Sequence, residues 1–146
     1  MILKNKKIVV TGGAGFVGSH LVENLIKVRK VNPKNIKIPR SKTYDLRIFA
    51  SAKKVIVGSD VVFNLACDVG GSSYSRLHPA KQCYNALLIA LQVIEAAKEQ
   101  GVEKIVMVSS TCAYPECAQQ PFKEDDLYGG LPYPSLDGYG MAKRMT

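Results

Sequence analysis

A tyrosine and a lysine, Tyr139 and Lys143, stand four residues apart in a segment whose residue pattern predicts a helix. Side chains at positions i and i+4 lie on one face of a helix, so the phenol and the ammonium group are expected to be neighbours. A nearby positive charge favours the phenolate, which should lower the tyrosine pKa from its usual value of about 10. The pair could therefore exchange a proton with a substrate near neutral pH.

Tyrosine and lysine at this spacing are common by chance, so their position in the chain matters. Ser109 and Ser110 close an apolar strand expected over residues 104–110 (KIVMVSS), upstream of the pair. Ligands of open α/β sheets bind at the carboxyl ends of the strands. The position of the two serines therefore supports a catalytic interpretation of Tyr139 and Lys143.

Three glycines, Gly12, Gly15 and Gly18, form the pattern G-x-x-G-x-x-G between a strand expected over 7–11 and a helix expected over 15–29. In a dinucleotide-binding turn the first glycine permits the tight turn, the second lets a pyrophosphate approach, and the third lets the helix pack on the strand. The helix N-terminus adds N–H groups and a positive dipole end. Such turns also serve packing alone, but the place of this one predicts nucleotide binding.

The residues after the second expected strand, 36–39, indicate which dinucleotide binds. NAD binding usually needs an acidic residue there, whereas this chain has Pro39, Arg40, Ser41 and Lys42. Arg40 with Ser41 could hold a 2′-phosphate through charge-assisted hydrogen bonds. The alternative is an exposed basic turn, so NADP is favoured and NAD stays open.

The elements that must position these groups alternate between strands and helices. Further strands are expected over 60–66 and 104–110, and further helices over 46–57, over 79–100 and from 137 onward. This alternation predicts the α/β class, with a Rossmann-like parallel sheet, helices on both faces, and strands in the order second, first, third, fourth. The residues expected to be buried are Val17, Leu21, Leu25 and Val28 in the first helix, and Cys83, Leu87, Ala90, Ile94 and Ala97 in the helix 79–100.

Between the fourth strand and the last helix, residues 114–138 form a segment rich in proline and glycine. It is far longer than the usual connection of two to six residues between a strand and a helix. We therefore expect this segment to be a wall or lid of the active site.

Composition limits the classes of partner. The 146 residues are 47% apolar and carry a net charge of +8, which suits an anionic partner, either a nucleic acid or a phosphorylated small molecule. The basic residues are spread along the chain, so no nucleic-acid partner is expected. No apolar run approaches the length of a membrane span or signal peptide, which indicates a cytoplasmic protein. Four cysteines without a C-x-x-C pair predict no metal site.

Several motifs together resemble the extended short-chain dehydrogenase/reductases, the nucleotide-sugar epimerase/dehydratase family. They are TGGAGFVG at 11–18, NLA at 64–66, SSTCAYP at 109–115 and YGMAK at 139–143. Within that family, PRSKTYDLR at 39–47, VGG at 69–71, CAYP at 112–115 and PFKEDDL at 121–127 resemble the GDP-L-fucose synthase group. The resemblance covers essentially the whole chain and implies an NADP-dependent or NAD-dependent enzyme that acts on a nucleotide sugar.

The resemblance also implies roles for individual residues. Tyr139 would exchange the hydroxyl proton, Lys143 would hold the nicotinamide ribose and tune Tyr139, and Ser110 would polarise the sugar carbonyl. Cys112 would move a proton during epimerisation, although a small buried hydrophobic role is equally open. The expected cofactor contacts are Gly12, Gly15, Phe16, Val17, Gly18, Arg40, Asp45 (near the adenine), Leu46, Leu65, Ala66, Tyr139 and Lys143. Cys67, Cys83 and Cys117 are interpreted as structural.

The family's chains continue well past residue 146, so residues 1–146 are expected to form one incomplete NAD(P)-binding Rossmann domain, the N-terminal portion of a longer enzyme. The expected reaction is reduction and epimerisation of a GDP-4-keto-6-deoxy sugar, with the fragment itself inactive and the complete enzyme a homodimer. One alternative is a nucleotide-sugar 4-epimerase or 4,6-dehydratase, which would share the same tyrosine, lysine and serine. Another is a non-catalytic dinucleotide-binding or regulatory module.

Overall fold

The computed structural model describes all residues 1–146, which divide into two compact units. The first unit comprises residues 1–66 and 89–108, and the second comprises residues 67–88 and 109–146. The glycine turn therefore belongs to the first unit, whereas the expected catalytic residues belong to the second. The prediction of a single nucleotide-binding domain over 1–146 stays a prediction.

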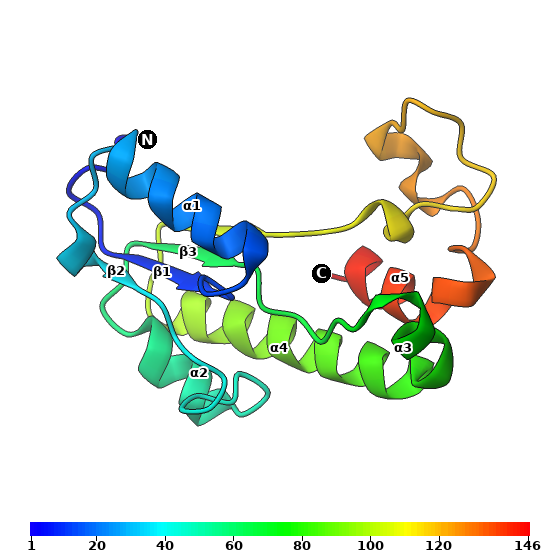
Figure 1. The fold of residues 1–146 in the computed structure, drawn as a ribbon, viewed down its shortest axis with the longest axis horizontal. Helices are drawn as coiled ribbons and strands as arrows, with labels where there is room; N and C mark the ends of the chain where they lie inside the picture. Colours follow the sequence, from blue (N-terminus) through cyan, green and yellow to red (C-terminus); the bar gives the residue numbers. More distant parts are fainter. The chain divides into compact units, whose positions relative to one another are not determined.

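A four-stranded parallel sheet forms the centre of the first unit (Figure 1). Its strands are β1 (Ile8–Thr11), β2 (Ile36–Lys37), β3 (Val61–Asn64) and β4 (Lys104–Met107). They lie in the order β2-β1-β3-β4, with Ile8 paired to both Ile36 and Val61. This confirms the predicted α/β class and strand order.

Helices cover both faces of this sheet, as Figure 1 shows: α1 (Phe16–Lys27) on one face, and α2 (Phe49–Ile56) with the second half of α4 (Pro79–Glu99) on the other. Side chains alternate across a strand, so successive residues of β1 enter different cores. Ile8 and Val10 pack with Leu25 of α1, whereas Val9 packs with residues of α2 and α4. Burial on both faces explains the uninterrupted apolar sequence of β1.

The predicted buried face of α1 is wrong at its two ends. Leu25 is buried and Leu21 is half-buried, but Val17 and Val28 are 62% and 63% exposed. A helix of 12 residues is roughly 18 Å long, whereas a strand of four residues spans only about 13 Å. The ends of the helix therefore extend past the sheet and have nothing to cover them.

The predicted face of α4 is also partly wrong. Ala90 and Ala97 are buried as expected, whereas Cys83, Leu87 and Ile94 are only half-buried. The other buried positions of this helix are Gln82, Asn85, Ala86, Val93 and Ala96. Two of these are polar and bind Asp68 through hydrogen bonds, so a search for apolar periodicity alone could not identify them.

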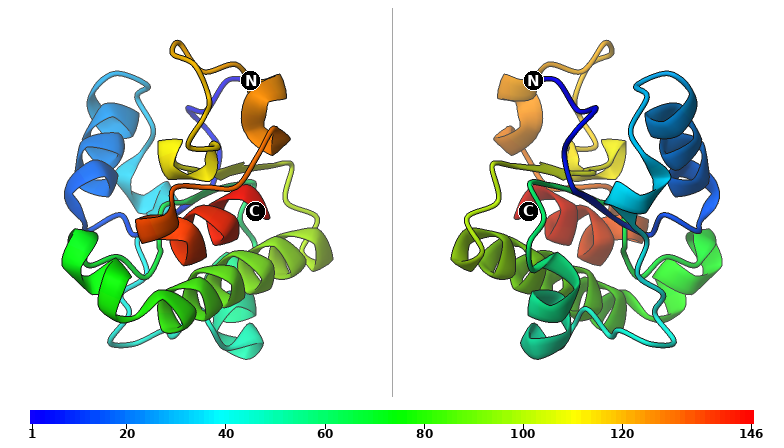
Figure 2. Two further views of the ribbon diagram at one scale, coloured as in Figure 1. Left: turned by 90° about the vertical axis from the view of Figure 1, so that its right-hand side faces the viewer. Right: turned by 90° about the vertical axis from the view of Figure 1, so that its left-hand side faces the viewer.

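The second unit holds the remaining elements. These are α3 (Gly71–Leu77), the first half of α4, the 3₁₀ turns η2 (Thr111–Ala113), η3 (Glu124–Tyr128) and η4 (Pro134–Leu136), and α5 (Asp137–Arg144); a further 3₁₀ turn, η1 (Pro33–Asn35), precedes β2 in the first unit. Helix α3 was not predicted, because GSSYSRL has no apolar period. The start of α5 lies against the start of α4 (Figure 2), where a Cβ atom on Gly138 would be 2.7 Å from the Pro79 carbonyl oxygen.

The fold contains neither a helix suited to span a membrane nor a cluster of metal ligands. None of its helices is long and apolar enough to cross a membrane. No group of three or more His, Cys, Asp or Glu side chains is arranged to hold a metal ion, and all four cysteines are free thiols.

A buried hydroxyl at the end of β1 provides a test of the fold. The Thr11 hydroxyl donates to Asn64 Oδ1 at 2.5 Å and accepts from the Ala66 N–H at 3.1 Å. Valine has the same shape but would leave both partners unpaired, so Thr11→Val should lower the free energy of unfolding by roughly 2–4 kcal/mol in urea titrations. The exposed Thr43 serves as a control, since Thr43→Val should change it by less than about 0.5 kcal/mol. Equal stabilities of the two variants would contradict the buried hydrogen bonds.

Candidate functional site

The turn between β1 and α1 requires glycine at its first and third positions for lack of space. Gly12 has a φ of 69°, in the left-handed region, and a Cβ atom there would lie 2.9 Å from the Leu65 carbonyl carbon. A Cβ atom on Gly18 would overlap the Gly12 carbonyl oxygen. The first turn of α1 therefore packs directly on the backbone of the glycine turn.

Gly15 has a different reason to be glycine. Its φ of −81° suits any residue, and a Cβ atom there would meet only the Gly12 carbonyl oxygen, at 3.2 Å. As the N-cap of α1 it has no side chain to accept hydrogen bonds from the first turn, and the neighbouring Phe16 is 83% exposed. The N-terminus of this helix is thus left open, which suits a phosphate group rather than the packing of the protein.

The basic turn predicted to select the cofactor is exposed. The Arg40 carbonyl oxygen accepts from the N–H groups of Thr43 and Tyr44, while the guanidinium lies on the surface. Asp45 is engaged by Arg47, whose Nη2 lies 2.7 Å from the carboxylate. The hydrogen bonds from Arg47 lower the pKa of the Asp45 carboxyl below its ordinary value. Sequence reasoning did not identify this ion pair, although its spacing of two residues was visible.

Three further residues expected to contact the cofactor, Leu46, Leu65 and Ala66, differ in their surroundings. Leu65 and Ala66 follow β3 directly and are half-buried next to the glycine turn. Leu46 is 8% exposed, and its side chain belongs to the core between the sheet and α2. A contact of Leu46 with a cofactor stays a prediction.

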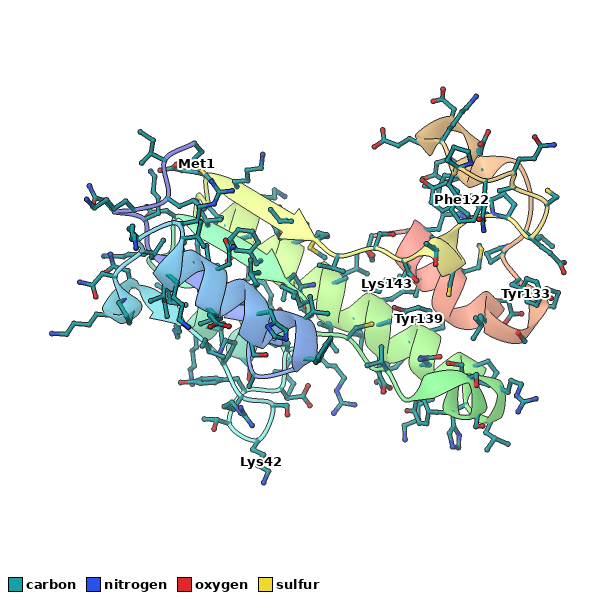
Figure 3. The ribbon with its side chains drawn as sticks, turned by 45° about the horizontal axis from the view of Figure 1, so that its top comes forward. Met1, Lys42, Phe122, Tyr133, Tyr139 and Lys143 are labelled. Atoms are coloured by element: carbon teal, nitrogen blue, oxygen red, sulfur yellow. The ribbon has the colours of Figure 1, made fainter.

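The expected catalytic residues Ser110, Cys112, Tyr139 and Lys143 are brought together in the second unit. The Ser110 side chain lies near the Tyr139 phenol and its hydroxyl accepts from the Cys112 N–H at 3.2 Å. Tyr139 and Lys143 come from successive turns of α5 (Figure 3), with Lys143 Nζ 5.9 Å from the centroid of the tyrosine ring. The grouping of Ser110, Tyr139 and Lys143 that spacing and strand position predicted is therefore present, and Cys112, named from the resemblance, lies next to Ser110.

A glycine inside α5 makes this grouping possible. A Cβ atom on Gly140 would overlap the Cys112 carbonyl oxygen and lie 2.8 Å from Cβ of Pro132. Ser109 adds a second link, because its hydroxyl donates to the Lys143 carbonyl oxygen at 3.2 Å. Helix α5 thus contacts the backbone of η2 directly, and the glycine after Tyr139 is the sequence signal that could have indicated this contact.

The pKa of Tyr139 shifts in the direction opposite to the prediction. Burial raises the pKa of the phenol, and the nearby thiols of Cys67 and Cys112 raise it further, while the nearby Ser110 side chain opposes them. The Lys143 ammonium lies 5.9 Å from the centroid of the ring, and burial of the phenol is the largest cause of the shift. Tyr139 therefore keeps its proton at neutral pH.

Cys67, interpreted above as structural, lies beside Tyr139 and Lys143. Its thiol is half-buried and lies near the side chains of both residues. Burial raises the pKa of the Cys67 thiol, although the lysine charge acts in the opposite direction. The structural interpretation of Cys67 stays a prediction, but the sequence did not indicate that this residue lies near α5, which begins seventy residues later in the chain.

Next to Cys67, a polar cluster around Asp68 was also missed. The Asp68 carboxylate accepts from the Tyr74 hydroxyl at 3.1 Å and from Asn85 Nδ2 at 2.7 Å, and its carbonyl oxygen accepts from Gln82 Nε2 at 3.1 Å. These bonds tie the segment after β3 to α3 and to the first half of α4. They hold the backbone that places the Cys67 thiol.

Comparison with known proteins identifies the family of this chain. Residues 8–146 match the NAD dependent epimerase/dehydratase family. The chain belongs to this family. Membership confirms the family resemblance and the Rossmann-like fold class inferred from the motifs.

The relatives of this family member include two kinds of GDP-sugar enzyme. The chain is 31% identical to GDP-mannose 3,5-epimerase of Arabidopsis thaliana and 35% identical to a probable GDP-L-fucose synthase of Drosophila melanogaster, with 98% and 96% of the chain covered. A GDP-mannoheptose C4 reductase from Campylobacter jejuni, solved with NADP bound, superposes with a TM-score of 0.88 at 29% identity over 97% of the chain. The chain spans 41%, 44% and 45% of the lengths of these three proteins.

Substitutions of Gly15 and Gly18 should have different effects, because the space around the two residues differs. In Gly15→Val the new side chain occupies the open helix N-terminus, so NADP binding measured by calorimetry should weaken by at least about tenfold while the melting temperature changes little. In Gly18→Ala the new methyl group overlaps the Gly12 carbonyl oxygen, so the melting temperature itself should fall. Unchanged NADP affinity in Gly15→Val would show that the turn does not hold the pyrophosphate.

Proposed function

We propose that this chain carries the cofactor-binding and proton-transfer groups of an NADP-dependent nucleotide-sugar reductase and epimerase that acts on a GDP-4-keto-6-deoxy sugar, as GDP-L-fucose synthases do. The observation that carries the proposal is the grouping of four side chains: Lys143 Nζ lies 5.9 Å from the centroid of the Tyr139 ring on the same helix, Ser110 lies near the phenol, and the Ser110 hydroxyl accepts from the Cys112 N–H. Because the chain spans less than half the length of its relatives, the activity is proposed for the complete protein and not for residues 1–146 alone.

The residues of the first unit fit NADP. The open N-terminus of α1 at Gly15 can take the pyrophosphate, and the exposed Arg40 can bind a 2′-phosphate where an NAD site would carry an acid. In the second unit, Lys143 holds the nicotinamide ribose. NADPH, when bound, supplies the hydride for reduction of a carbonyl group.

Tyr139 and Ser110 act on the carbonyl oxygen of the sugar. The Tyr139 hydroxyl donates its proton to this oxygen as the carbonyl carbon receives the hydride, so the product is an alcohol and the tyrosine is left as a phenolate. Ser110 donates a hydrogen bond to the same oxygen and stabilises the charge that develops on it. The raised pKa of Tyr139 keeps the donor protonated, which favours the direction of reduction.

Cys112 distinguishes this reaction from simple reduction. Cys112 follows Ser110 by two residues, and its backbone N–H donates to the Ser110 hydroxyl. The Cys112 thiol is therefore close to the group that binds the carbonyl. The hydrogen on a carbon next to a carbonyl is acidic. Cys112 can remove this proton from one face of the sugar, and a second group can donate a proton to the opposite face of the same carbon. A 4-epimerase or 4,6-dehydratase would use Tyr139, Lys143 and Ser110 without this step.

We further propose that the complete protein is a homodimer that uses the outer side of α4. Tyr84 and Leu91, on the side of this helix away from its buried residues, are 64% and 51% exposed. These two large apolar side chains are seven residues apart, so they lie on the same side of the helix. Exposed apolar side chains on one side of a long helix favour contact with a second copy.

The experiment that tests the function measures two reactions of the complete protein. NADPH oxidation with a GDP-4-keto-6-deoxy sugar reports reduction, and deuterium uptake from D₂O into the sugar reports epimerisation. Cys112→Ala should abolish deuterium uptake but retain reduction of an already epimerised keto sugar, with Cys117→Ala, an exposed thiol, as the matched control. Normal deuterium uptake in Cys112→Ala would make Cys112 structural, and no NADPH oxidation by the unaltered protein would contradict the function.

The state of Tyr139 predicts a pH dependence. Because its pKa is raised above the ordinary value of about 10, reduction should be nearly independent of pH between roughly 6 and 9, while the reverse oxidation, which needs the phenolate, should accelerate about tenfold for each pH unit. Tyr139→Phe should abolish both directions with little change in NADP affinity. Tyr133→Phe, an exposed tyrosine of the preceding loop (Figure 3), is the control and should behave as the unaltered protein. A reductive rate that falls between pH 6 and 8 would contradict this assignment.

A further inference from the structure

Arg144, the last residue of α5, joins this helix to two separate points of the loop that precedes it. Its Nε donates to the Ala113 carbonyl oxygen at 2.8 Å, and its Nη1 donates to the Gly130 carbonyl oxygen at 2.8 Å. Its guanidinium carbon also lies 6.0 Å from the centroid of the Tyr128 ring. One side chain therefore connects α5, η2 and the distant end of the loop.

The two carbonyl acceptors belong to segments that are themselves paired. Pro115 and Pro132 form an antiparallel bridge, and the Glu116 N–H donates to the Leu131 carbonyl oxygen at 3.1 Å. We name residues 113–116 and 130–132 the loop stem. Arg144 binds both of its strands, so the stem cannot shift on α5 without breaking one of the two hydrogen bonds.

Arg144 shares a face of α5 with Gly140, one turn earlier. Gly140 contacts the Cys112 carbonyl oxygen and Pro132, which adjoin or belong to the same two segments that Arg144 binds. Ser110 precedes η2 and lies near Tyr139 of α5. The contacts that place Ser110 and Cys112 relative to Tyr139 therefore include both Gly140 and Arg144.

The hydrogen bonds of Arg144 are better suited to fixing the position of the loop stem than to stabilising the folded protein. Nη2 of Arg144 is buried without a partner, and both hydrogen-bond acceptors are backbone carbonyls rather than carboxylates. An apolar side chain could fill the same space without leaving a charged N–H unpaired. A planar guanidinium, however, directs its N–H groups at fixed angles, which neither an apolar side chain nor lysine can do.

We propose that Arg144 is a positioning residue for the reaction: it holds the loop stem on α5 and thereby sets the placement of Ser110 and Cys112 relative to Tyr139. This rests on the proposed function, in which Ser110 and Tyr139 act on one carbonyl oxygen and Cys112 acts on the neighbouring carbon. Arg144 acts only through these groups. A misplacement of about 1 Å between reacting groups can lower a rate by roughly a hundredfold.

The test compares Arg144→Met and Arg144→Lys in the complete protein with Arg76→Met, a substitution of an exposed arginine on α3. Both Arg144 variants should show a kcat that is roughly tenfold to a hundredfold lower, with the KM for NADPH within about twofold, because the glycine turn is untouched. Arg144→Lys keeps the charge but should not restore kcat. Arg76→Met should match the unaltered protein in both constants.

A role in stability alone would give a different result. It would lower the melting temperature but leave kcat unchanged per folded molecule, counted by bound NADPH below the melting transition. A kcat within about twofold of the unaltered protein in Arg144→Met, measured in this way, overturns the proposal.

Hydrogen exchange separates this proposal from the proposed function. The Glu116 amide, bonded across the loop stem, should exchange faster in Arg144→Met than in Arg76→Met. If the unaltered protein turns over no keto sugar, the proposed function fails and the exchange decides on the contact alone. Unchanged exchange at Glu116 then overturns the contact between Arg144 and the loop stem, and faster exchange supports this contact while the positioning role falls with the reaction.

Discussion

Each unit of this protein depends on one helix that approaches a turn so closely that no side chain fits between them. In the first unit α1 meets the glycine turn at Gly18, against the Gly12 carbonyl oxygen. In the second, α5 meets η2 at Gly140, against the Cys112 carbonyl oxygen. The first contact leaves the helix N-terminus open beside Gly15, and the second brings Tyr139 to Ser110. Both functional regions thus follow from close backbone packing rather than from charged contacts.

The balance of forces at Tyr139 decides which proton chemistry is favourable. A lysine four residues away on the same helix would favour the phenolate if its charge lay at the phenol oxygen. In this structure the ammonium group lies 5.9 Å from the centroid of the ring, and burial of the phenol is the largest influence and raises its pKa. The result is a proton donor at neutral pH. That state suits the reduction of a carbonyl, where the oxygen needs a proton as the carbon receives a hydride.

The surroundings of the catalytic groups are held largely by backbone acceptors. Arg144 binds two carbonyl oxygens, Ser109 binds the Lys143 carbonyl oxygen, and Gln82 binds that of Asp68. Backbone groups cannot change rotamer, so such bonds position a segment more rigidly than contacts between two long side chains. These backbone contacts are supplied by segments outside the sheet, so the sheet itself does not determine how the groups near Tyr139 are held.

Apart from Cys112, which was assigned to the site from the family resemblance, the sequence by itself determined the class of fold, the strand order, the glycine turn and the grouping of Ser110, Tyr139 and Lys143. These follow from local spacing and from the rule that parallel strands present their carboxyl ends together. Only the tertiary structure decided that Val17 and Val28 are exposed, because a helix longer than its sheet leaves its ends uncovered. The positions of Cys67, Asp68 and Arg144 likewise depend on contacts between segments far apart in the chain, as does the balance between burial and charge that sets the pKa of Tyr139. No local pattern of residues encodes such contacts.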